Sequence, residues 1–141
     1  MSLEVKAEQI SPQVDSIARC IERIESKKPF TLEKLKSDFD LQDVISVNLE
    51  RIVQASVNIS GMIISKSQYP APLEMAECFE VLKTLQFIDD YTCLRMKKAV
   101  GFRNLMVHEY EKIDWQIVFR ITENHLEDFK SFVRQVLTKI I

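Results

Sequence analysis

The sequence predicts an all-α protein, a single up-and-down bundle of five to six helices that spans residues 1–141. Only two glycines and four prolines are present, so the tight turns of a hairpin-rich fold are scarce. Apolar residues instead recur every three to five positions over long stretches, which is typical of amphipathic helices. With 46% hydrophobic residues, a chain of 141 residues can bury one core and does not require a second domain.

The first helix is predicted to run to about Lys27 and to end before Pro29. Its apolar positions are Val5, Ile10, Val14, Ile17, Ile21 and Ile24. A short second helix is predicted to begin at Thr31, whose hydroxyl can accept a hydrogen bond from the first turn. Phe30 and Leu35 are placed as a hydrophobic staple around this cap.

The third helix is predicted to be the longest, capped by Asp40 with Phe39 and Val44 as its staple. Its apolar period comprises Leu41, Ile45, Leu49, Ile52, Ala55, Ile59 and Ile63. Residues 65–72 contain two prolines among polar residues and are predicted to form a loop. Pro72 suits the first turn of a fourth helix. The expected inward face of that helix is Met75, Phe79, Leu82 and Leu85.

Asp89 or Asp90 is expected to begin the fifth helix. The residues predicted to face the core are Leu94, Val100 or Gly101, Leu105 and Met106. A last long helix is predicted to begin at Asp114, with Ile113 and Val118 as its staple. Its expected buried face is Ile117, Ile121, Phe129, Val133, Val136 and Ile140.

The charge balance limits the surfaces that could bind nucleic acid. The net charge is −2, whereas proteins that hold nucleic acid by its backbone alone usually have a basic face. Any RNA contact must therefore be local, and Arg95, Lys97 and Lys98 are the candidates because they share the predicted fifth helix with Arg103. The alternative is that these three residues form an ordinary charged helix surface.

Other features favour a soluble cytoplasmic protein. No apolar run has the length of a membrane span, and residues 1–6 lack the pattern of a signal peptide. Cys20, Cys78 and Cys93 are odd in number and widely spaced, which favours buried thiols over disulfides or a zinc site. No metal site and no cofactor is expected, because His108 and His125 lie on different helices without evident companion ligands. His125 is interpreted as a core or interface histidine, and Trp115 as a packing anchor.

The stretch 103–110, called the motif below, is the candidate for catalysis. It combines the permanent cation of Arg103, the amide of Asn104, the imidazole of His108 and the phenol of Tyr110. His108 can act as an acid or a base near neutral pH, and Arg103 can brace a phosphate. Asn104 and His108, four residues apart, share a helix face, so Asn104 could orient the imidazole. Arg103 and His108 are splayed by roughly 140° on an ideal helix, so one copy of the motif does not assemble a site.

A two-fold dimer would bring two imidazoles and two guanidiniums to one cleft. One histidine could then remove the proton of a ribose 2′-hydroxyl while the other protonates the departing 5′-oxygen, and arginine would stabilise the charged phosphorus. The predicted product is a 2′,3′-cyclic phosphate. DNA, which lacks the 2′-hydroxyl, should not be cut.

The residues of the motif resemble the signature of a known protein family. An arginine, a polar residue, three more residues and then His-x-Tyr, as in residues 103–110, resembles the signature of the HEPN ribonucleases, and in particular of HepT-like toxins. The order of the predicted helices and the segments 40–51 and 126–129 are similar to that family as well. The resemblance extends over nearly the whole chain.

The resemblance implies the HEPN type of helical bundle and a homodimeric, metal-independent endoribonuclease with catalytic Arg103 and His108. It implies the toxin of a type VII toxin–antitoxin system, encoded with a minimal nucleotidyltransferase antitoxin that transfers AMP from ATP to Tyr110. AMP at the cleft edge would add bulk and negative charge where RNA phosphate must bind. The alternative is a non-catalytic helical module that binds a nucleotidyltransferase or a nucleotide, because an intact motif does not prove turnover.

Overall fold

The computed structural model describes residues 5–140, and all regular elements in this range are helices. These are α1 (Ala7–Ser26), α2 (Leu32–Ser37), α3 (Phe39–Ser65), α4 (Glu77–Thr84), α5 (Asp90–His108), the 3₁₀ turn η1 (Tyr110–Lys112), α6 (Trp115–Asn124) and α7 (Leu126–Ile140). The predicted all-α bundle is confirmed, with seven described α-helices in place of five to six. Part of the segment on which the signal-peptide prediction rests, residues 1–4, lies outside the described residues.

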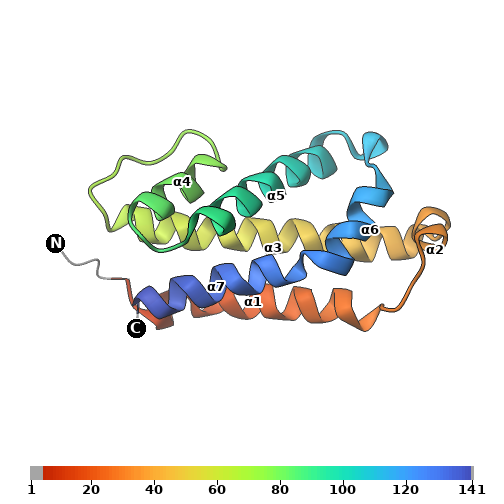
Figure 1. Cartoon of the computed structure of the whole chain (residues 1–141), viewed down its shortest axis with the longest axis horizontal. Helices are drawn as coiled ribbons and strands as arrows, with labels where there is room; N and C mark the ends of the chain where they lie inside the picture. The colour runs from red at the N-terminus through yellow and green to blue at the C-terminus, as the bar shows by residue number, and fades with distance from the viewer. Residues whose placement is uncertain (1–4, 141) are drawn as a thin grey trace.

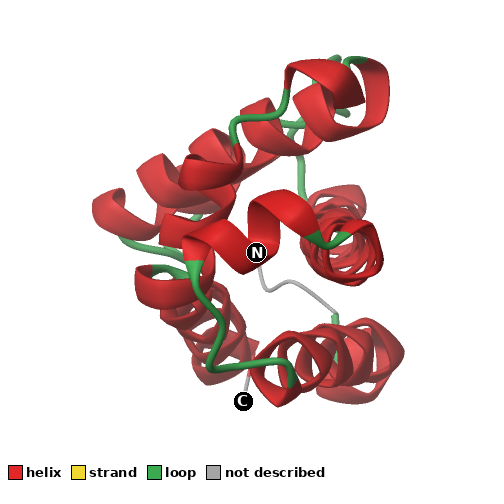
Figure 2. Ribbon diagram, turned by 90° about the vertical axis from the view of Figure 1, so that its right-hand side faces the viewer, coloured by secondary structure: helices red, strands yellow, loops and turns green. Residues whose placement is uncertain are grey.

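The 27-residue α3 is the central helix of the bundle. It contacts α1, α2, α4, α5 and α7, and its closest packing is against α1. Figure 1 shows α1 and α7 side by side along one flank of α3, running in opposite directions, with α4 and α5 on the other flank. Helices α2 and α6 lie together across one end of the long helices, which Figure 2 shows from that end.

The core contains aliphatic side chains from every long helix, together with two phenylalanines whose rings are in contact. Phe79 of α4 and Phe132 of α7 are fully buried, and their rings meet edge to face with centroids 5.6 Å apart. The three cysteines are also buried, as predicted, and burial raises the pKa of the Cys78 thiol to about 11. No helix within residues 5–140 is both long and apolar enough to cross a membrane.

The predicted starts of two helices are wrong. Asp38, not Asp40, caps α3, because its carboxylate accepts a hydrogen bond from the amide of Leu41 at 3.0 Å. The Phe39 staple therefore fails, and this side chain is 75% exposed. Helix α4 begins at Glu77 rather than at Pro72, and residues 66–76 connect it to α3 as a long loop over the surface.

The prediction for the inward face of α5 is also wrong in part. Helix α5 contacts α3, α4 and α7, and the buried side chains that meet them are Thr92, Cys93, Met96, Val100 and Met106. Leu94 is 52% exposed, Gly101 is exposed, and Leu105 is only partly buried. Apolar residues occur on both sides of α5, so periodicity alone could not identify the side that packs.

The predicted last long helix is two helices, α6 and α7, separated at His125. Helix α6 packs against α2, whereas α7 packs against α1 and α5, and a straight helix could not satisfy both. Asp114 caps α6 as predicted, but Ile117 is 40% exposed and Val118 is the fully buried residue. No proline or glycine marks this break in the sequence.

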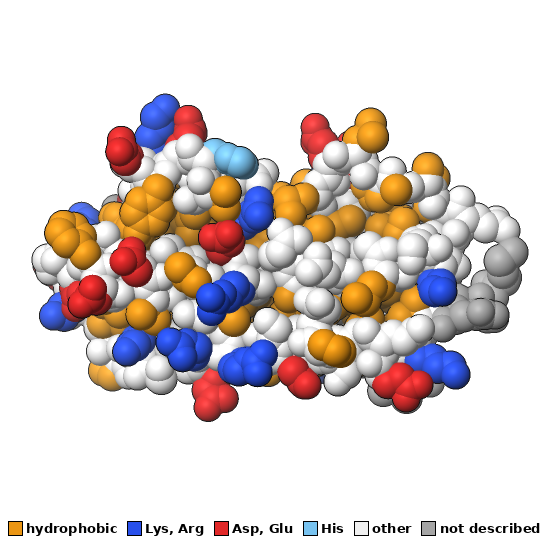
Figure 3. All heavy atoms as spheres, turned by 180° about the vertical axis from the view of Figure 1, so that it is seen from behind, with side chains coloured by type: hydrophobic (Ala, Val, Ile, Leu, Met, Phe, Trp, Pro, Cys, Tyr) orange, Lys and Arg blue, Asp and Glu red, His pale blue; other side chains and the backbone are white. Residues whose placement is uncertain are grey.

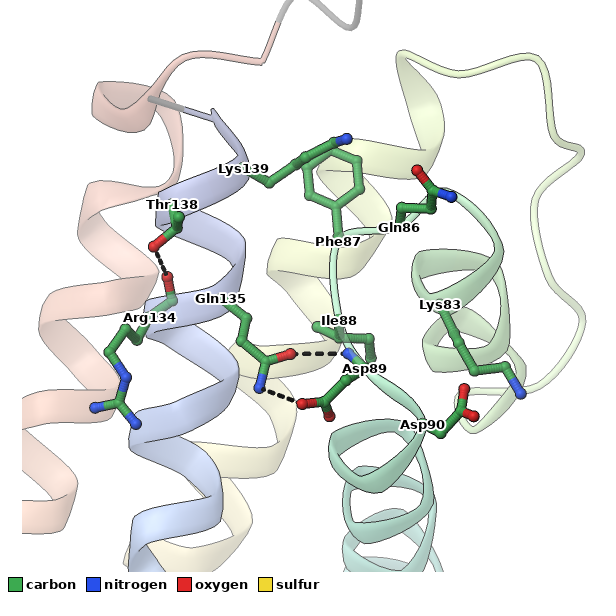
Figure 4. Close-up of a pocket in the computed structure, with 10 residues that line it drawn as sticks. All are labelled: Lys83, Gln86, Phe87, Ile88, Asp89, Asp90, Arg134, Gln135, Thr138 and Lys139. Carbon is green, nitrogen blue, oxygen red and sulfur yellow. Dashed lines mark hydrogen bonds between the residues drawn. The ribbon is translucent and has the colours of Figure 1, made fainter.

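The start of α5 is fixed by Asp89 (Figure 4), which settles the choice between Asp89 and Asp90. Its carboxylate accepts a hydrogen bond from the amide of Thr92 at 2.7 Å, and this bond is the main reason why the pKa of Asp89 is lowered. Gln135 of α7 accepts the backbone N–H of Asp89 at 2.8 Å and donates to its carboxylate at 3.3 Å. The cap thus also joins α5 to α7.

Asp89→Ala should lower the free energy of unfolding by about 1 kcal/mol, the usual cost of losing a carboxylate cap. Asp90→Ala is the matched control and should cost less, because Asp90 makes no capping hydrogen bond. Since folding lowers the pKa of Asp89, its contribution is complete above the unfolded-state pKa and fades as the pH falls through the folded-state pKa. Urea unfolding at neutral and acidic pH measures both effects. Equal losses in the two variants would contradict the assignment of the cap.

Candidate functional site

The motif lies where α5 ends. Residues 103–108 form the last turns of this helix, and Tyr110 begins the 3₁₀ turn η1. Figure 3 shows this face of the molecule hollowed between two raised parts, which by their place in Figure 1 are the end of α5 and the region of α4 with the loop before it. Acidic and basic side chains are interspersed on the face, so it has no extended field of one sign.

Arg103 connects the end of α5 to α3 and to the loop before α4. Its Nη2 donates to Oε1 of Gln54 on α3 at 3.2 Å, and its Nη1 lies 3.8 Å from the sulfur of Met75. Nη1 also donates to Oδ1 of Asn104 at 3.3 Å. The Nε atom is buried without a hydrogen-bond partner among the described residues. The guanidinium is therefore held in place with donor capacity left over.

The charge of Arg103 is not neutralised within the described part of the chain. All three of its contacts are to neutral atoms, and no carboxylate there lies within ion-pair distance of it. The other arginine of α5, Arg95, instead pairs with Asp128 at 3.0 Å. A half-buried cation without a counter-ion is costly alone, so an incoming anion should bind to it favourably.

His108 is the last residue of α5 and is exposed to solvent. Its side chain makes no hydrogen bond or ion pair within residues 5–140, so the orienting contact expected from Asn104 is not formed there. The amide oxygen of Asn104 instead accepts a hydrogen bond from Arg103. Arg103 is bonded to Gln54 of α3 whereas His108 is exposed, and no hydrogen bond joins the two side chains within residues 5–140. A free imidazole at a surface can exchange protons with a bound substrate.

Tyr110 lies at the edge of the same region and is 40% exposed. Its hydroxyl donates to the carboxylate of Asp43 on α3 at 3.3 Å, and its ring meets Trp115 edge to face at 5.9 Å. Burial raises the pKa of the phenol, and the negative charge of Asp43 raises it further. The phenol is therefore neutral near pH 7, and its oxygen can be reached from solvent.

The three basic candidates on α5 differ in their surroundings. Arg95 is paired with Asp128, and Lys97 donates to Glu80 at 2.8 Å. Hydrogen bonds from Lys97 and Lys83 lower the pKa of Glu80 to about 2, so that carboxylate stays charged. Lys98 is exposed, with no ion pair to any described residue. Of the three, Lys98 alone has no ion-pair partner in the described part of the chain.

A groove of about 250 Å³ lies between α5, α6 and α7. It is lined by Arg95, Lys98, Ala99, Phe102, Ile117, Arg120, Ile121, His125, Asp128 and Phe129. His125 is partly buried there, with Nδ1 3.0 Å from the carboxylate of Asp128, which fits its interpretation as a satisfied structural histidine. Trp115, packed against the core and Tyr110, similarly fits the role of an anchor.

The wider pocket in Figure 4 is far from the motif. It lies around the start of α5 and the end of α7, and Asp90 is about 27 Å from His108 along the helix axis. Among its polar side chains, Asp89 and Gln135 are hydrogen-bonded to each other, and the Thr138 hydroxyl donates to the backbone carbonyl of Arg134. Among residues 5–140, no three His, Cys, Asp or Glu side chains form a group that could hold a metal ion.

Three residues that contact the motif could not be identified from the sequence of the motif itself. Gln54 and Met75 contact Arg103, and Asp43 contacts Tyr110. Asp43 lies within the segment 40–51 that resembles the HepT-like family, so that segment could have pointed to it. Gln54 and Met75 are brought to the motif only by the packing of α3 and the loop before α4.

The chain is similar in sequence to proteins of known function. Residues 17–136 match the sequence profile of the family described as "Ribonuclease HepT-like". The chain is 33% identical over 121 residues to the mRNA nuclease HepT of Shewanella oneidensis, which covers 86% of this chain and 90% of that protein. It is 26% identical over 132 residues to the tRNA nuclease HepT of Aphanizomenon flos-aquae, covering 94% and 90% of the two chains.

The structure of the chain also superposes on that of a solved protein. The tri-AMPylated HEPN toxin of Shewanella oneidensis, in complex with its MNT antitoxin, superposes with a TM-score of 0.85 at 32% identity. The match covers 92% of this chain and 96% of that toxin. The residues that match the family profile, 17–136, span the motif and the helices α3, α4, α5 and α6.

Proposed function

This chain belongs to the Ribonuclease HepT-like family, and we propose that it is a cytoplasmic endoribonuclease and the toxin of a toxin–antitoxin pair. The observation that carries the proposal is that one motif at the end of α5 holds an imidazole and a guanidinium, neither of which has an ion-pair partner within residues 5–140. These two groups supply proton transfer and charge stabilisation without a metal ion. Metal-independence is part of the proposal.

The reaction requires both an acid and a base, and we propose that a homodimer supplies them. The His108 of one copy takes the proton of the ribose 2′-hydroxyl while the 2′-oxygen bonds to phosphorus. The His108 of the second copy protonates the departing 5′-oxygen. Arg103 stabilises the negative charge that grows on the phosphoryl oxygens. The products are a 2′,3′-cyclic phosphate and a free 5′-hydroxyl, and DNA is not cut.

The outward side of α5 supports the dimer. Tyr91, Leu94, Lys98, Gly101, Leu105 and His108 follow one another at alternating steps of three and four residues. Tyr91 and Leu94 are 59% and 52% exposed. Within residues 5–140, no atom other than those of the adjacent residues and the helix's own backbone lies within 4 Å of where a Cβ on Gly101 would be. This spacing suits helix-against-helix packing, and the stripe ends at His108. The same stripe contains Lys98, which we propose as an RNA contact.

The regulator is proposed to be a nucleotidyltransferase that places AMP on Tyr110. The similarity of this chain to a toxin solved in tri-AMPylated form with an MNT antitoxin supports the modification. The exposed phenol supports its position, because a partner enzyme can approach Tyr110 from solvent without unfolding the bundle.

Incubation of unmodified protein with RNA in excess EDTA tests the activity. RNA should be cut to products with 2′,3′-cyclic phosphate ends, while the same sequence with 2′-deoxy sugars stays intact. Light scattering of the preparation should give twice the chain mass of 16.5 kDa. Intact RNA, with or without added Mg²⁺, would instead favour a non-catalytic binding module. Cleavage only without EDTA would refute metal-independence.

A further inference from the structure

A row of side-chain amides leads from α1 across α3 to the motif arginine. Nδ2 of Asn58 donates to Oε1 of Gln13 on α1 at 3.4 Å, and Nε2 of Gln54 donates to Oδ1 of Asn58 at 3.0 Å. Nη2 of Arg103 then donates to Oε1 of Gln54 at 3.2 Å. We call Gln13, Asn58 and Gln54 the amide row.

The amide row has one direction. Asn58 donates to the oxygen of Gln13 and Gln54 donates to the oxygen of Asn58, so each of the three oxygens is turned toward the next donor. The Gln54 oxygen is thereby directed at Arg103, and its nitrogen, which would repel a guanidinium, is occupied by Asn58. The row therefore selects one orientation of the Gln54 amide, and with it one position of the Arg103 side chain.

Gln54 is a neutral partner for Arg103, which matters because Arg103 must keep its positive charge available to bind phosphate. A carboxylate at position 54 could make the same contact to Arg103, but it would also neutralise the guanidinium. Arg95 on the same helix shows this second arrangement, because Asp128 accepts from its Nε at 3.0 Å. At Arg103 the position is fixed by neutral acceptors, and the positive charge remains available.

We propose that Gln54 is a positioning residue for RNA cleavage, which holds the guanidinium of Arg103 in place while leaving its charge free for the scissile phosphate. This inference rests on the proposed ribonuclease function. Gln54 lies 49 positions from Arg103 in the sequence, outside the motif.

The variants Gln54→Glu and Gln54→Met distinguish two effects on Arg103, namely the neutralisation of its charge and the loss of its position. Glu is nearly isosteric and keeps an oxygen facing Arg103, so the melting temperature should be unchanged or higher. Its negative charge should nevertheless lower kcat/KM for RNA by about 10²-fold, the effect of losing one preorganised group that stabilises the transition state. Met removes the hydrogen bond without adding charge, and a less well-placed arginine should lower kcat by about tenfold.

Asn58→Asp is the matched control. It adds the same charge one helical turn along α3, where Asn58 contacts Gln54 and Gln13 but not Arg103. If Gln54 acts through its contact with Arg103, Asn58→Asp should lower kcat/KM far less than Gln54→Glu does. Equal losses in both variants would indicate general repulsion of RNA and would overturn the proposal.

The order of the two Gln54 variants provides a second check. A purely structural role predicts that activity follows the melting temperature, so that Met is the more damaging substitution. Wild-type activity in Gln54→Glu, or loss of activity only in proportion to unfolding, would overturn the role of Gln54 and leave the ribonuclease intact. Absence of cleavage by the wild-type protein would overturn both.

Discussion

His108→Ala should lower the rate of RNA cleavage by a factor of about 10²–10⁴, the range usual for removing a general acid or base. In the proposed dimer the substitution removes the base and the acid together, so the loss should lie toward the upper end. Initial rates on a defined RNA in EDTA, with the protein free of AMP, measure the effect.

The same substitution should leave the fold unchanged. His108 is exposed at the end of α5 and makes no hydrogen bond or ion pair within the described residues, so its loss breaks no polar contact inside the protomer. The melting temperature and the dimer mass should therefore match those of the wild type. His125→Ala is a useful comparison, since it should affect stability through Asp128 while cleavage persists. Equal cleavage by His108→Ala and wild type would refute the catalytic role.

AMP on Tyr110 should reduce RNA cleavage by at least about 10²-fold, because it places a negatively charged, bulky group beside the proposed phosphate site. In the transfer, the phenolic oxygen of Tyr110 bonds to the α-phosphorus of ATP, and the bond to the departing pyrophosphate breaks. The phenolic proton must go to a base, because a tyrosine phenol is neutral near pH 7 and the surroundings of Tyr110 raise its pKa further. The Asp43 carboxylate already accepts this hydrogen bond.

Tyr110→Phe separates regulation from catalysis. It should cleave RNA at close to the wild-type rate, since the phenol is not required for proton transfer, and it should stay active after treatment with the nucleotidyltransferase and ATP. Intact-mass measurement should show added AMP on the wild type and none on Tyr110→Phe. Tyr69→Phe, which removes another exposed phenol, is the matched control and should still be modified and inhibited. Modification of Tyr110→Phe would refute the assignment of the acceptor.

Several local features of the fold were predictable because they depend on few neighbouring residues. Thr31, Asp89 and Asp114 can cap the helices that follow them because each side chain reaches an amide two or three residues onward. The error at Asp38 and Asp40 has the same origin, since both are good caps and lie two residues apart. The break at His125 could not be read from neighbours, because contacts of α6 with α2 and of α7 with α1 decide it.

The sequence by itself determined the helical class, the single core and the motif with its resemblance to a ribonuclease family, since each depends on composition or on short spacings along one helix. The tertiary structure alone decided which side of α5 packs, and hence that a stripe ending at His108 faces outward. It also decided that Arg103 meets the neutral Gln54 and that Tyr110 meets Asp43. These pairs lie 49 and 67 residues apart, and only the packing of α3 against the end of α5 brings them within hydrogen-bonding distance.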